Sequence, residues 1–174
     1  MDLRSVTIET ERLLLVPISA KYRQEIFQAF TDRVARYTWP QPTGNIADTD
    51  AFISGSLDSM GRGGELQFVA VSKNSEEFIG CTGLHHLWTR PEPGLWLKES
   101  AWNNGFGFEI VAALKRWADE HIEYEYLYYP VHKDNVPSRR IPEKLGGISE
   151  EEEFISQNAR GEDHTIVAYR IYRT

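Results

Sequence analysis

The chain has 174 residues, of which 41% are hydrophobic and 26% are charged, a balance typical of one globular domain and unlike that of disordered or fibrous proteins. Its 26 acidic and 19 basic residues give a net charge of −7, which disfavours nucleic acid as a partner. Cys81 is the single cysteine, so an internal disulfide and a metal site of paired cysteines are excluded.

The N-terminal third of the chain predicts a strand followed by two helices. A short apolar run that closes on a proline indicates a strand at Arg12–Ile18. Apolar residues at three- and four-residue spacing then predict a helix over Ala20–Phe30, with Ser19 as its N-cap. After a loop that contains two prolines, a second helix is expected over Ile46–Met60. The side chains expected to point inward from this helix are Ala51, Phe52, Ile53 and Leu57.

The middle of the chain predicts a β-hairpin and one strongly amphipathic helix. Strands are expected at Leu66–Val71 and Phe78–Leu84, which a polar turn joins in antiparallel order. A third strand covers Leu95–Leu97. The segment Phe108–Ile122 then carries an apolar stripe on one face and charged residues on the other, so it predicts a helix packed on the core.

The C-terminal part predicts two further strands and one helix. Aromatic and β-branched residues indicate strands at Tyr124–Val131 and His164–Tyr172. Between them, Asn135 begins a helix that reaches Leu145. The order of elements predicts a single α/β domain over residues 1–174, built around a largely antiparallel sheet.

Two glycines just before the Phe108 helix form a candidate anion site. The first amides of a helix have no intrahelical acceptor and lie at the positive end of the helix dipole. Gly105 and Gly107 carry no Cβ, which lets the backbone approach a bulky phosphate group. A dinucleotide fingerprint would need a glycine where Ile110 stands, and the Gly-Lys-Ser/Thr of a P-loop is absent. A plain tight turn is the alternative interpretation.

Short motifs recur in a fixed order along the chain. They are Glu11-Arg12-Leu13, Phe78-Ile79-Gly80, Gly94-Leu95-Trp96-Leu97, Trp102-Asn103-Asn104-Gly105-Phe106-Gly107, Asn135-Val136-Pro137-Ser138-Arg139-Arg140 and Glu143-Lys144-Leu145-Gly146. In this order they resemble the GNAT superfamily of acyl-CoA-dependent N-acetyltransferases. The likeness spans residues 9–172 and is greatest to the RimJ/RimL-type branch, which acetylates the N-terminal amines of ribosomal proteins.

This resemblance implies a twisted, mixed but mostly antiparallel sheet with helices on both faces, splayed between its fourth and fifth strands, with acetyl-CoA in the gap. The fourth strand would pair with the pantetheine arm at Trp96, Leu97 and Lys98, and Asn135 would also bond the arm. Arg140 and Lys144 would add positive charge near the phosphates, although a solvated helix face is the alternative. The residues implied around the pyrophosphate are Trp102, Asn103, Asn104, Gly105, Phe106, Gly107 and Phe108.

The resemblance also implies that an amine attacks the thioester directly. The backbone amide of Leu97 would stabilise the oxyanion, and Ser138 would protonate the departing thiolate or else only bond its own helix start. Gln157 stands where the nearest relatives have a catalytic glutamate, so the base is open. The candidates for the base are Glu153, His85, His86 and Asp163.

The acceptor is predicted from amine chemistry. An α-amino group with a pKa of about 7.7 is far more neutral at pH 7 than a lysine amine at about 10.4, so a weak base favours a protein N-terminus. The alternatives are a polyamine or antibiotic acetyltransferase and a non-catalytic CoA-binding module. Tyr37, Trp39, Phe52 and Trp88 are candidates for an acceptor cleft or for the core.

The remaining expectations concern partners and location. No segment reaches the roughly 20 apolar residues of a membrane span, so we expect a cytoplasmic protein without membrane contact. We expect no metal and no nucleic acid, and a monomer or homodimer.

Overall fold

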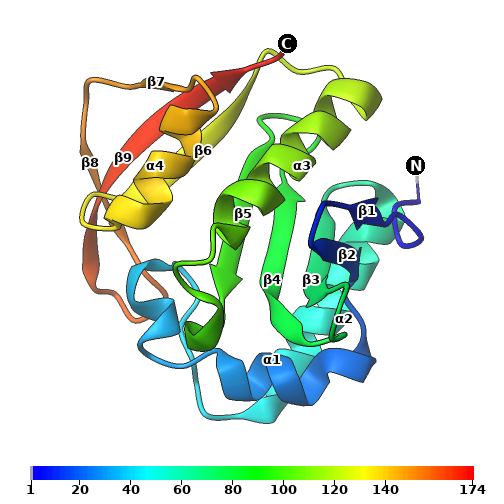
Figure 1. The fold of residues 1–174 in the computed structure, drawn as a ribbon. Helices are drawn as coiled ribbons and strands as arrows, with labels where there is room; N and C mark the ends of the chain where they lie inside the picture. The colour runs from blue at the N-terminus through cyan, green and yellow to red at the C-terminus, as the bar shows by residue number, and fades with distance from the viewer. Residues whose placement is uncertain (1) are drawn as a thin grey trace.

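The computed structural model describes residues 2–174, in which two antiparallel sheets are covered by four α-helices (Figure 1). The first sheet has the strand order β1-β2-β3-β4-β5 and the second the order β6-β9-β7, with β8 also paired to β9. The strands are β1 Ile8–Glu9, β2 Leu13–Pro17, β3 Leu66–Ser72, β4 Phe78–His85, β5 Glu92–Leu97, β6 Tyr126–His132, β7 Ile148–Ser149, β8 Phe154–Gln157 and β9 Asp163–Tyr172. The helices are α1 Arg23–Ala29, α2 Ile46–Arg62, α3 Phe106–His121 and α4 Val136–Lys144, with short 3-10 turns η1 Ala20–Tyr22, η2 Val34–Tyr37 and η3 Glu99–Ala101.

The first sheet is built on the predicted hairpin. β3 and β4 are buried along almost their whole length and pair in antiparallel register, with Val69 opposite Cys81. Their near-continuous runs of apolar and small residues fit central strands covered on both faces. β2 and β5 then pair outside them, and β5 is longer than predicted, because it begins at Glu92 rather than Leu95.

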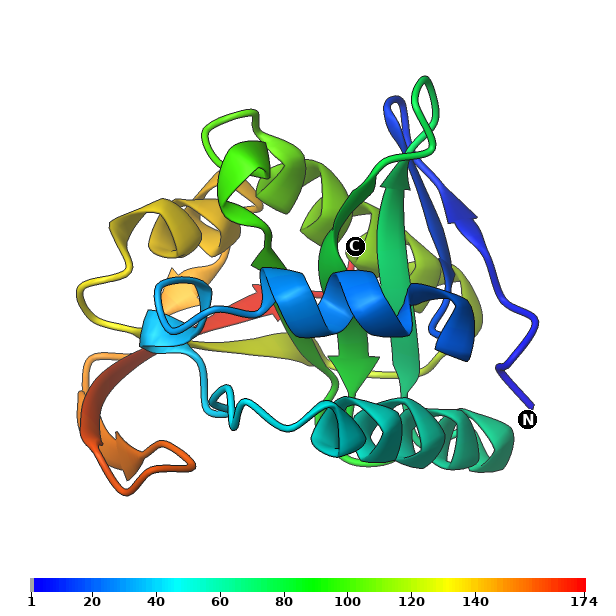
Figure 2. The ribbon, with the colours of Figure 1, turned by 90° about the horizontal axis from the view of Figure 1, so that it is seen from below.

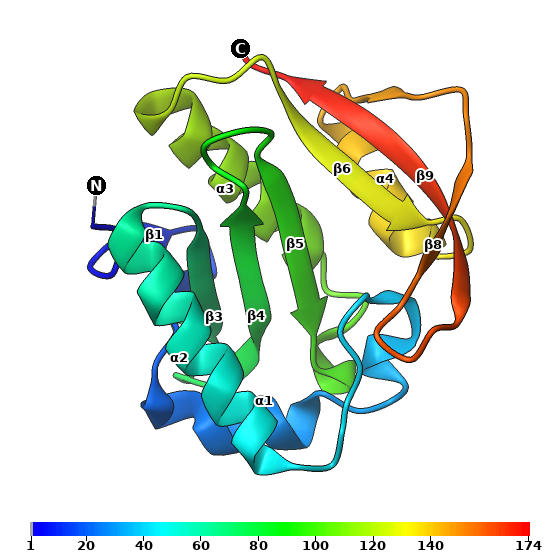
Figure 3. The same cartoon turned by 180° about the vertical axis from the view of Figure 1, so that it is seen from behind.

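The two sheets separate between β5 and β6. These strands run in the same direction and lie close near Pro91, whose carbonyl accepts a hydrogen bond of 2.9 Å from the Tyr128 amide. They diverge toward their C-terminal ends (Figure 3). Without the short β1, which was not predicted, β5 and β6 are the predicted fourth and fifth strands, so the predicted α/β fold with a splayed sheet is confirmed.

Helices cover both faces of the first sheet. α3 lies on one face and α2 on the other, and α1 crosses the lower end of the strands (Figure 2). The stripe of α3 is buried through Val111, Leu114 and Trp117, as predicted. In α2 the prediction was partly wrong, because Ala51 and Phe52 are exposed and the buried face passes through Ile53, Ser56 and Met60.

Three other local features differ from the prediction. The predicted helix over Ala20–Phe30 begins as the 3-10 turn η1, and the Ser19 side chain makes no capping bond. The strands β1, β7 and β8 were not predicted, because each has at most four residues and the last two are largely exposed, without an alternating apolar pattern. None of the helices within residues 2–174 has the length and apolar character that crossing a bilayer requires.

Candidate active site

A cavity of about 560 Å³ lies between the end of β5, the loop before α3, η2 and the start of α4. All but one of the predicted cofactor residues line it. They are Trp96, Leu97, Trp102, Asn103, Asn104, Gly105, Phe106, Gly107, Phe108, Asn135, Ser138, Arg140 and Lys144. We call it the donor cavity, after the acetyl donor that the sequence predicts there. Lys98 does not line it, because its ammonium group pairs with Glu77 outside the cavity.

The loop before α3 has the backbone conformation that its sequence predicts, for partly different reasons. Gly105 is the N-cap of α3 and has φ +77°, in the left-handed region that favours glycine. Asn103 is also left-handed at φ 61°. Gly107 is needed for packing: a Cβ there would lie 3.1 Å from Ile141 Cδ1. The two glycines therefore shape the loop and let α3 approach α4.

Arg12, which is far from this loop in the sequence, holds the loop in place. Its Nη1 donates to the carbonyl of Asn104 at 2.8 Å, its guanidinium pairs with Glu109 at 2.7 Å and it lies over the Phe106 ring at 4.4 Å. Burial raises the pKa of Glu109, but hydrogen bonds from Thr10 and Arg12 outweigh it and hold the pKa below its usual value. The motif around Arg12 was identified in the sequence, but this role was not.

The donor cavity is locally positive in an acidic protein. Arg33, Arg36, Arg140 and Lys144 line it, and Asp134 is the one carboxylate among its lining residues. Arg33 and Arg36 were not predicted, because Arg33 precedes η2 and Arg36 lies on it, far in sequence from the loop. An anionic cofactor therefore meets an excess of cations despite the overall charge of −7.

The backbone of β5 presents free polar groups to the gap. The Lys98 amide donates to the Ile79 carbonyl of β4 at 2.9 Å. Because amides alternate sides along a strand, the Leu97 amide points the opposite way, toward the gap. The Leu97 carbonyl accepts from Trp102 Nε1 at 2.9 Å, which fixes the end of this strand.

Ser138 is held between two partners at the start of α4. Its amide donates to Asn135 Oδ1 at 3.3 Å, so Asn135 caps the helix. Its Oγ lies 2.9 Å from the hydroxyl of Tyr129, a buried residue of β6. Burial raises the pKa of Tyr129 to about 12, so the phenol stays protonated at neutral pH. Tyr129 was not identified in the sequence.

A second cavity, of about 620 Å³, opens on the other side of the gap. It is lined by parts of β4, β5, β6, β8 and β9 and by the loop after η2. We call it the acceptor cavity. It shares six residues with the donor cavity: Tyr37, Thr38, Leu95, Trp96, Asn135 and Ser138. The two cavities therefore meet beside Trp96 and Ser138, at the point where the sheets separate.

This arrangement agrees with what comparison with known proteins found. The family model described as the acetyltransferase (GNAT) domain matches residues 12–148. The chain belongs to the GNAT acetyltransferase family. The prediction of an acyltransferase of this family is thus confirmed. A search of curated proteins found no match.

Solved GNAT structures share the fold over almost the whole chain. One is an acetyltransferase from Salmonella typhimurium that modifies the N-terminal serine of a 50S ribosomal subunit protein, at 16% identity and TM-score 0.82, with 96% of this chain and 99% of that one covered. Another is the ribosomal α-N-protein acetyltransferase RimL in complex with coenzyme A, at 17% identity and TM-score 0.81, with 96% of this chain and 98% of that one covered. A third is the microcin C7 self-immunity acetyltransferase MccE in complex with acetyl-CoA and AMP, at 16% identity and TM-score 0.81, with 93% of each chain covered.

The GNAT site has few of the bases that were considered. Glu153 lines neither cavity, because it pairs with Lys133 at 2.9 Å on the surface. His86 and Asp163 also lie outside both cavities, and Asp163 accepts a bond of 3.0 Å from Gln157. Of the four candidates only His85 lines the acceptor cavity, with Nδ1 3.0 Å from Glu65.

Glu92 is a carboxylate that the sequence analysis missed. It lines the acceptor cavity, and it has no hydrogen bond or ion pair with any side chain of residues 2–174. Burial raises the pKa of Glu92, against the weaker opposing effect of His86, His85 and Arg90. A perturbed carboxylate without a partner is typical of a functional site. Its position at the head of β5, four residues before Trp96, was the only signal in the sequence.

Two histidines lie together on the opposite wall of the acceptor cavity. His132 and His164 lie edge to face at 4.7 Å, and both line the acceptor cavity. Burial, together with His164, lowers the pKa of His132. Its Nδ1 accepts the Asp134 amide at 3.1 Å, so the neutral ring carries its proton on Nε2 and presents a donor. In this tautomer His132 has no free ring nitrogen to accept the proton of an amine.

Cys81 is the one thiol that could carry the acetyl group as a covalent enzyme intermediate. Burial raises the pKa of its thiol far above the usual value, so it is a poor nucleophile although it lines the acceptor cavity. We expect Cys81→Ala to keep turnover within about threefold of the parent protein, because no acyl-enzyme forms. Iodoacetamide should label Cys81 in urea and leave the folded protein unlabelled. A turnover loss of more than about tenfold in a folded variant would indicate a relay.

Proposed function

We propose that the protein transfers an acetyl group from acetyl-CoA to a primary amine by direct attack on the thioester. The observation that carries this proposal is the junction of the donor and acceptor cavities beside Trp96 and Ser138. A thioester placed there has a backbone amide on one side and a path for an amine on the other. The family and the CoA-bound GNAT structures support acetyl-CoA as the donor.

The loop and the cations of the donor cavity hold the cofactor. Amides at the start of α3 lack intrahelical acceptors, and with Arg140 and Lys144 they bind the diphosphate. The pantetheine arm lies along the free edge of β5, where its amides complete the hydrogen bonds of the strand. Asn135 donates to the arm through Nδ2, since its Oδ1 caps α4.

The reaction needs an oxyanion donor, an acid and a base. When the amine nitrogen attacks the carbonyl carbon, the Leu97 amide stabilises the oxyanion, an interaction that contributes several kcal/mol in a dry site. The C–S bond then breaks, and Ser138 gives the thiolate a proton and regains one from solvent. Glu92 takes the proton of the attacking amine through water in the acceptor cavity.

The acceptor that we favour is the N-terminal α-amine of a protein. Its low pKa leaves a larger neutral fraction for attack, and the Salmonella protein of this fold acts on an N-terminal serine. A small amine is the second candidate, since a cavity of about 620 Å³ is within the range of small-molecule sites and MccE is a self-immunity enzyme.

Free thiol release tests this proposal. The protein is mixed with acetyl-CoA and with N-terminal peptides, lysine-only peptides or diamines, and CoA thiol is followed over time. We expect release with free N-terminal peptides and none with the same peptides blocked at the N-terminus. Thermal stabilisation by acetyl-CoA without thiol release from any amine would indicate a binding module instead.

The base is tested by pH. Since the pKa of Glu92 is raised, activity should fall as the pH drops through a value above that of an ordinary glutamate. We expect Glu92→Gln to lower kcat/KM about tenfold at neutral pH and to remove the contribution of Glu92 to this acid limb, leaving only the fall that protonation of the amine itself causes. The profile is measured under saturating acetyl-CoA, with Glu153→Gln as the control that keeps the limb. An unchanged profile in the Glu92 variant would assign the limb to another group.

A further inference from the structure

Three exposed aromatic side chains border the acceptor cavity from elements far apart in the sequence. Trp39 follows η2 and is 66% exposed, Phe52 on α2 is 39% exposed and Phe154 on β8 is 42% exposed. We call these three residues the aromatic rim. Leaving large apolar groups in water at the mouth of one cavity is unfavourable, and such a cluster is typical of a binding surface.

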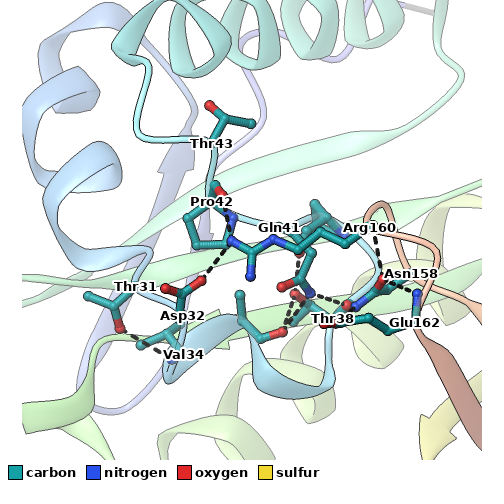
Figure 4. A network of polar contacts seen from close by, with 12 residues as sticks. Thr31, Asp32, Val34, Thr38, Gln41, Pro42, Thr43, Asn158, Arg160 and Glu162 are labelled. Atoms are coloured by element: carbon teal, nitrogen blue, oxygen red, sulfur yellow. Dashed lines mark hydrogen bonds and ion pairs between the residues drawn. The ribbon is translucent and has the colours of Figure 1, made fainter.

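The backbone under the rim is held firmly. The Trp39 carbonyl accepts the Ala159 amide at 2.9 Å, from the turn between β8 and β9. Arg160 of the same turn donates to Asp32 at 2.7 Å and to the Pro42 carbonyl at 2.8 Å (Figure 4). The loop that carries Trp39 is thus bound to the turn that follows Phe154. A pre-ordered aromatic surface loses little conformational freedom on binding.

The charges inside the cavity limit the kind of amine that fits. Its lining residues include one carboxylate, Glu92, one guanidinium, Arg90, and three histidines. Arg90 lies over the Tyr128 ring at 3.7 Å and leaves Glu92 without an ion pair. There is one acidic group for one ammonium, and Arg90 would repel a second cation. A polyamine therefore matches this lining poorly.

We propose that the acceptor carries a single primary amine joined to a large apolar group, which the aromatic rim binds while the amine reaches the junction of the cavities. A peptide whose first residue is aromatic or large and aliphatic has this chemistry, and so has a small arylalkylamine. The inference rests on the proposed function and names its substrate class.

The test compares peptides that differ only in the first residue: Phe, Leu, Ala, Ser or Lys before the same three residues, together with phenethylamine and spermidine. We expect kcat/KM for Phe and Leu to exceed that for Ala and Ser about tenfold, as burial of one apolar side chain predicts. Comparison of kcat/KM for phenethylamine and for the Phe peptide shows whether the better acceptor is a small molecule or a peptide. A flat ranking, or spermidine or Lys as the best acceptor, would overturn the inference.

Variants of the rim sharpen this test. Trp39→Ala and Phe154→Ala should reduce the preference for Phe over Ala to about twofold, because they lower kcat/KM for the Phe peptide more than for the Ala peptide. Trp88→Ala is the matched control, because Trp88 is 70% exposed and lies outside the acceptor cavity. Equal losses with every acceptor, or the same loss of preference in the Trp88 variant, would contradict the role of the rim.

Binding separates this inference from the proposed function. The same peptides are titrated by calorimetry into protein saturated with CoA. Tighter binding of the Phe peptide without thiol release from acetyl-CoA would contradict the proposed reaction and support the binding role of the aromatic rim. Thiol release with no apolar preference in binding or turnover would support the reaction and contradict the role of the rim.

Discussion

Replacing Gly105 with valine should weaken acetyl-CoA binding about a hundredfold in a protein that still folds. A β-branched residue is strongly disfavoured at φ +77°, so the peptide groups of the loop must rotate. The amides at the start of α3 then no longer point at the diphosphate. Losing one or two hydrogen bonds to a charged group, at about 1.5–3 kcal/mol each, corresponds to this change in affinity. Calorimetric titration of acetyl-CoA measures it.

Gly146→Val is the control for this experiment. Gly146 has φ +73° and open space around its Cβ position, and it lies beyond the end of α4, away from both cavities. The Gly146→Val variant should lose about as much free energy of unfolding through backbone strain as the Gly105→Val variant, and it should keep its affinity for acetyl-CoA. If both variants bind the cofactor as the parent protein does, the loop does not bind the diphosphate.

Ser138→Ala should lower kcat about a hundredfold with little change in the KM for acetyl-CoA, because the hydroxyl acts on the leaving thiolate rather than on binding. Tyr129→Phe should give part of this loss. The protonated phenol lies 2.9 Å from Ser138 Oγ, and if it donates to that oxygen, the serine proton is left free to point toward the sulfur. Tyr129 is in this sense a positioning residue.

A spectroscopic readout separates this role from a structural one. The thiolate of bound CoA absorbs more strongly than the thiol in the short-wavelength ultraviolet, so its pKa can be titrated on the enzyme by difference spectra. With Ser138 donating to sulfur, this pKa should lie below that of free CoA, and it should rise in both variants. Tyr126→Phe, on the same strand but outside both cavities, should leave it unchanged. An unaltered thiol pKa in the Ser138 variant would remove the serine from the proton transfer.

Local patterns were enough to predict most helices and strands and the glycine loop before α3, whereas the splayed sheet was implied by the resemblance to the GNAT superfamily. The helix α3, the hairpin of β3 and β4 and the glycine loop each depend on neighbours within about twenty residues, where periodicity and turn chemistry decide the structure. The order of motifs then predicted which cavity the loop would border. Thirteen of the fourteen cofactor residues line that cavity, although their contacts with acetyl-CoA stay predictions.

The supporting residues could not be predicted in the same way. Arg12 meets Asn104 only because the fold brings together residues far apart in the sequence, and Ser138 meets Tyr129 only because α4 packs on β6. Glu92 stands in an unremarkable Pro- and Gly-containing segment, and only its burial in the acceptor cavity marks it. Phe52 was predicted on the inner face of α2 and was also named as a candidate for the acceptor cleft, and only the structure shows that it is exposed and borders that cavity.

If acetyl-CoA binds along β5 as proposed, the divergence of β5 from β6 makes the stability of the protein depend on its metabolic surroundings. The Leu97 amide on the free edge of β5 points into the gap, where water or a bound molecule can accept its hydrogen bond. If the cofactor arm occupies this edge, it acts as an additional strand, and the folded state gains about 2.7 kcal/mol when the cofactor is present at a hundred times its dissociation constant. Starvation for acyl-CoA would then expose the chain to proteolysis as well as deprive it of substrate.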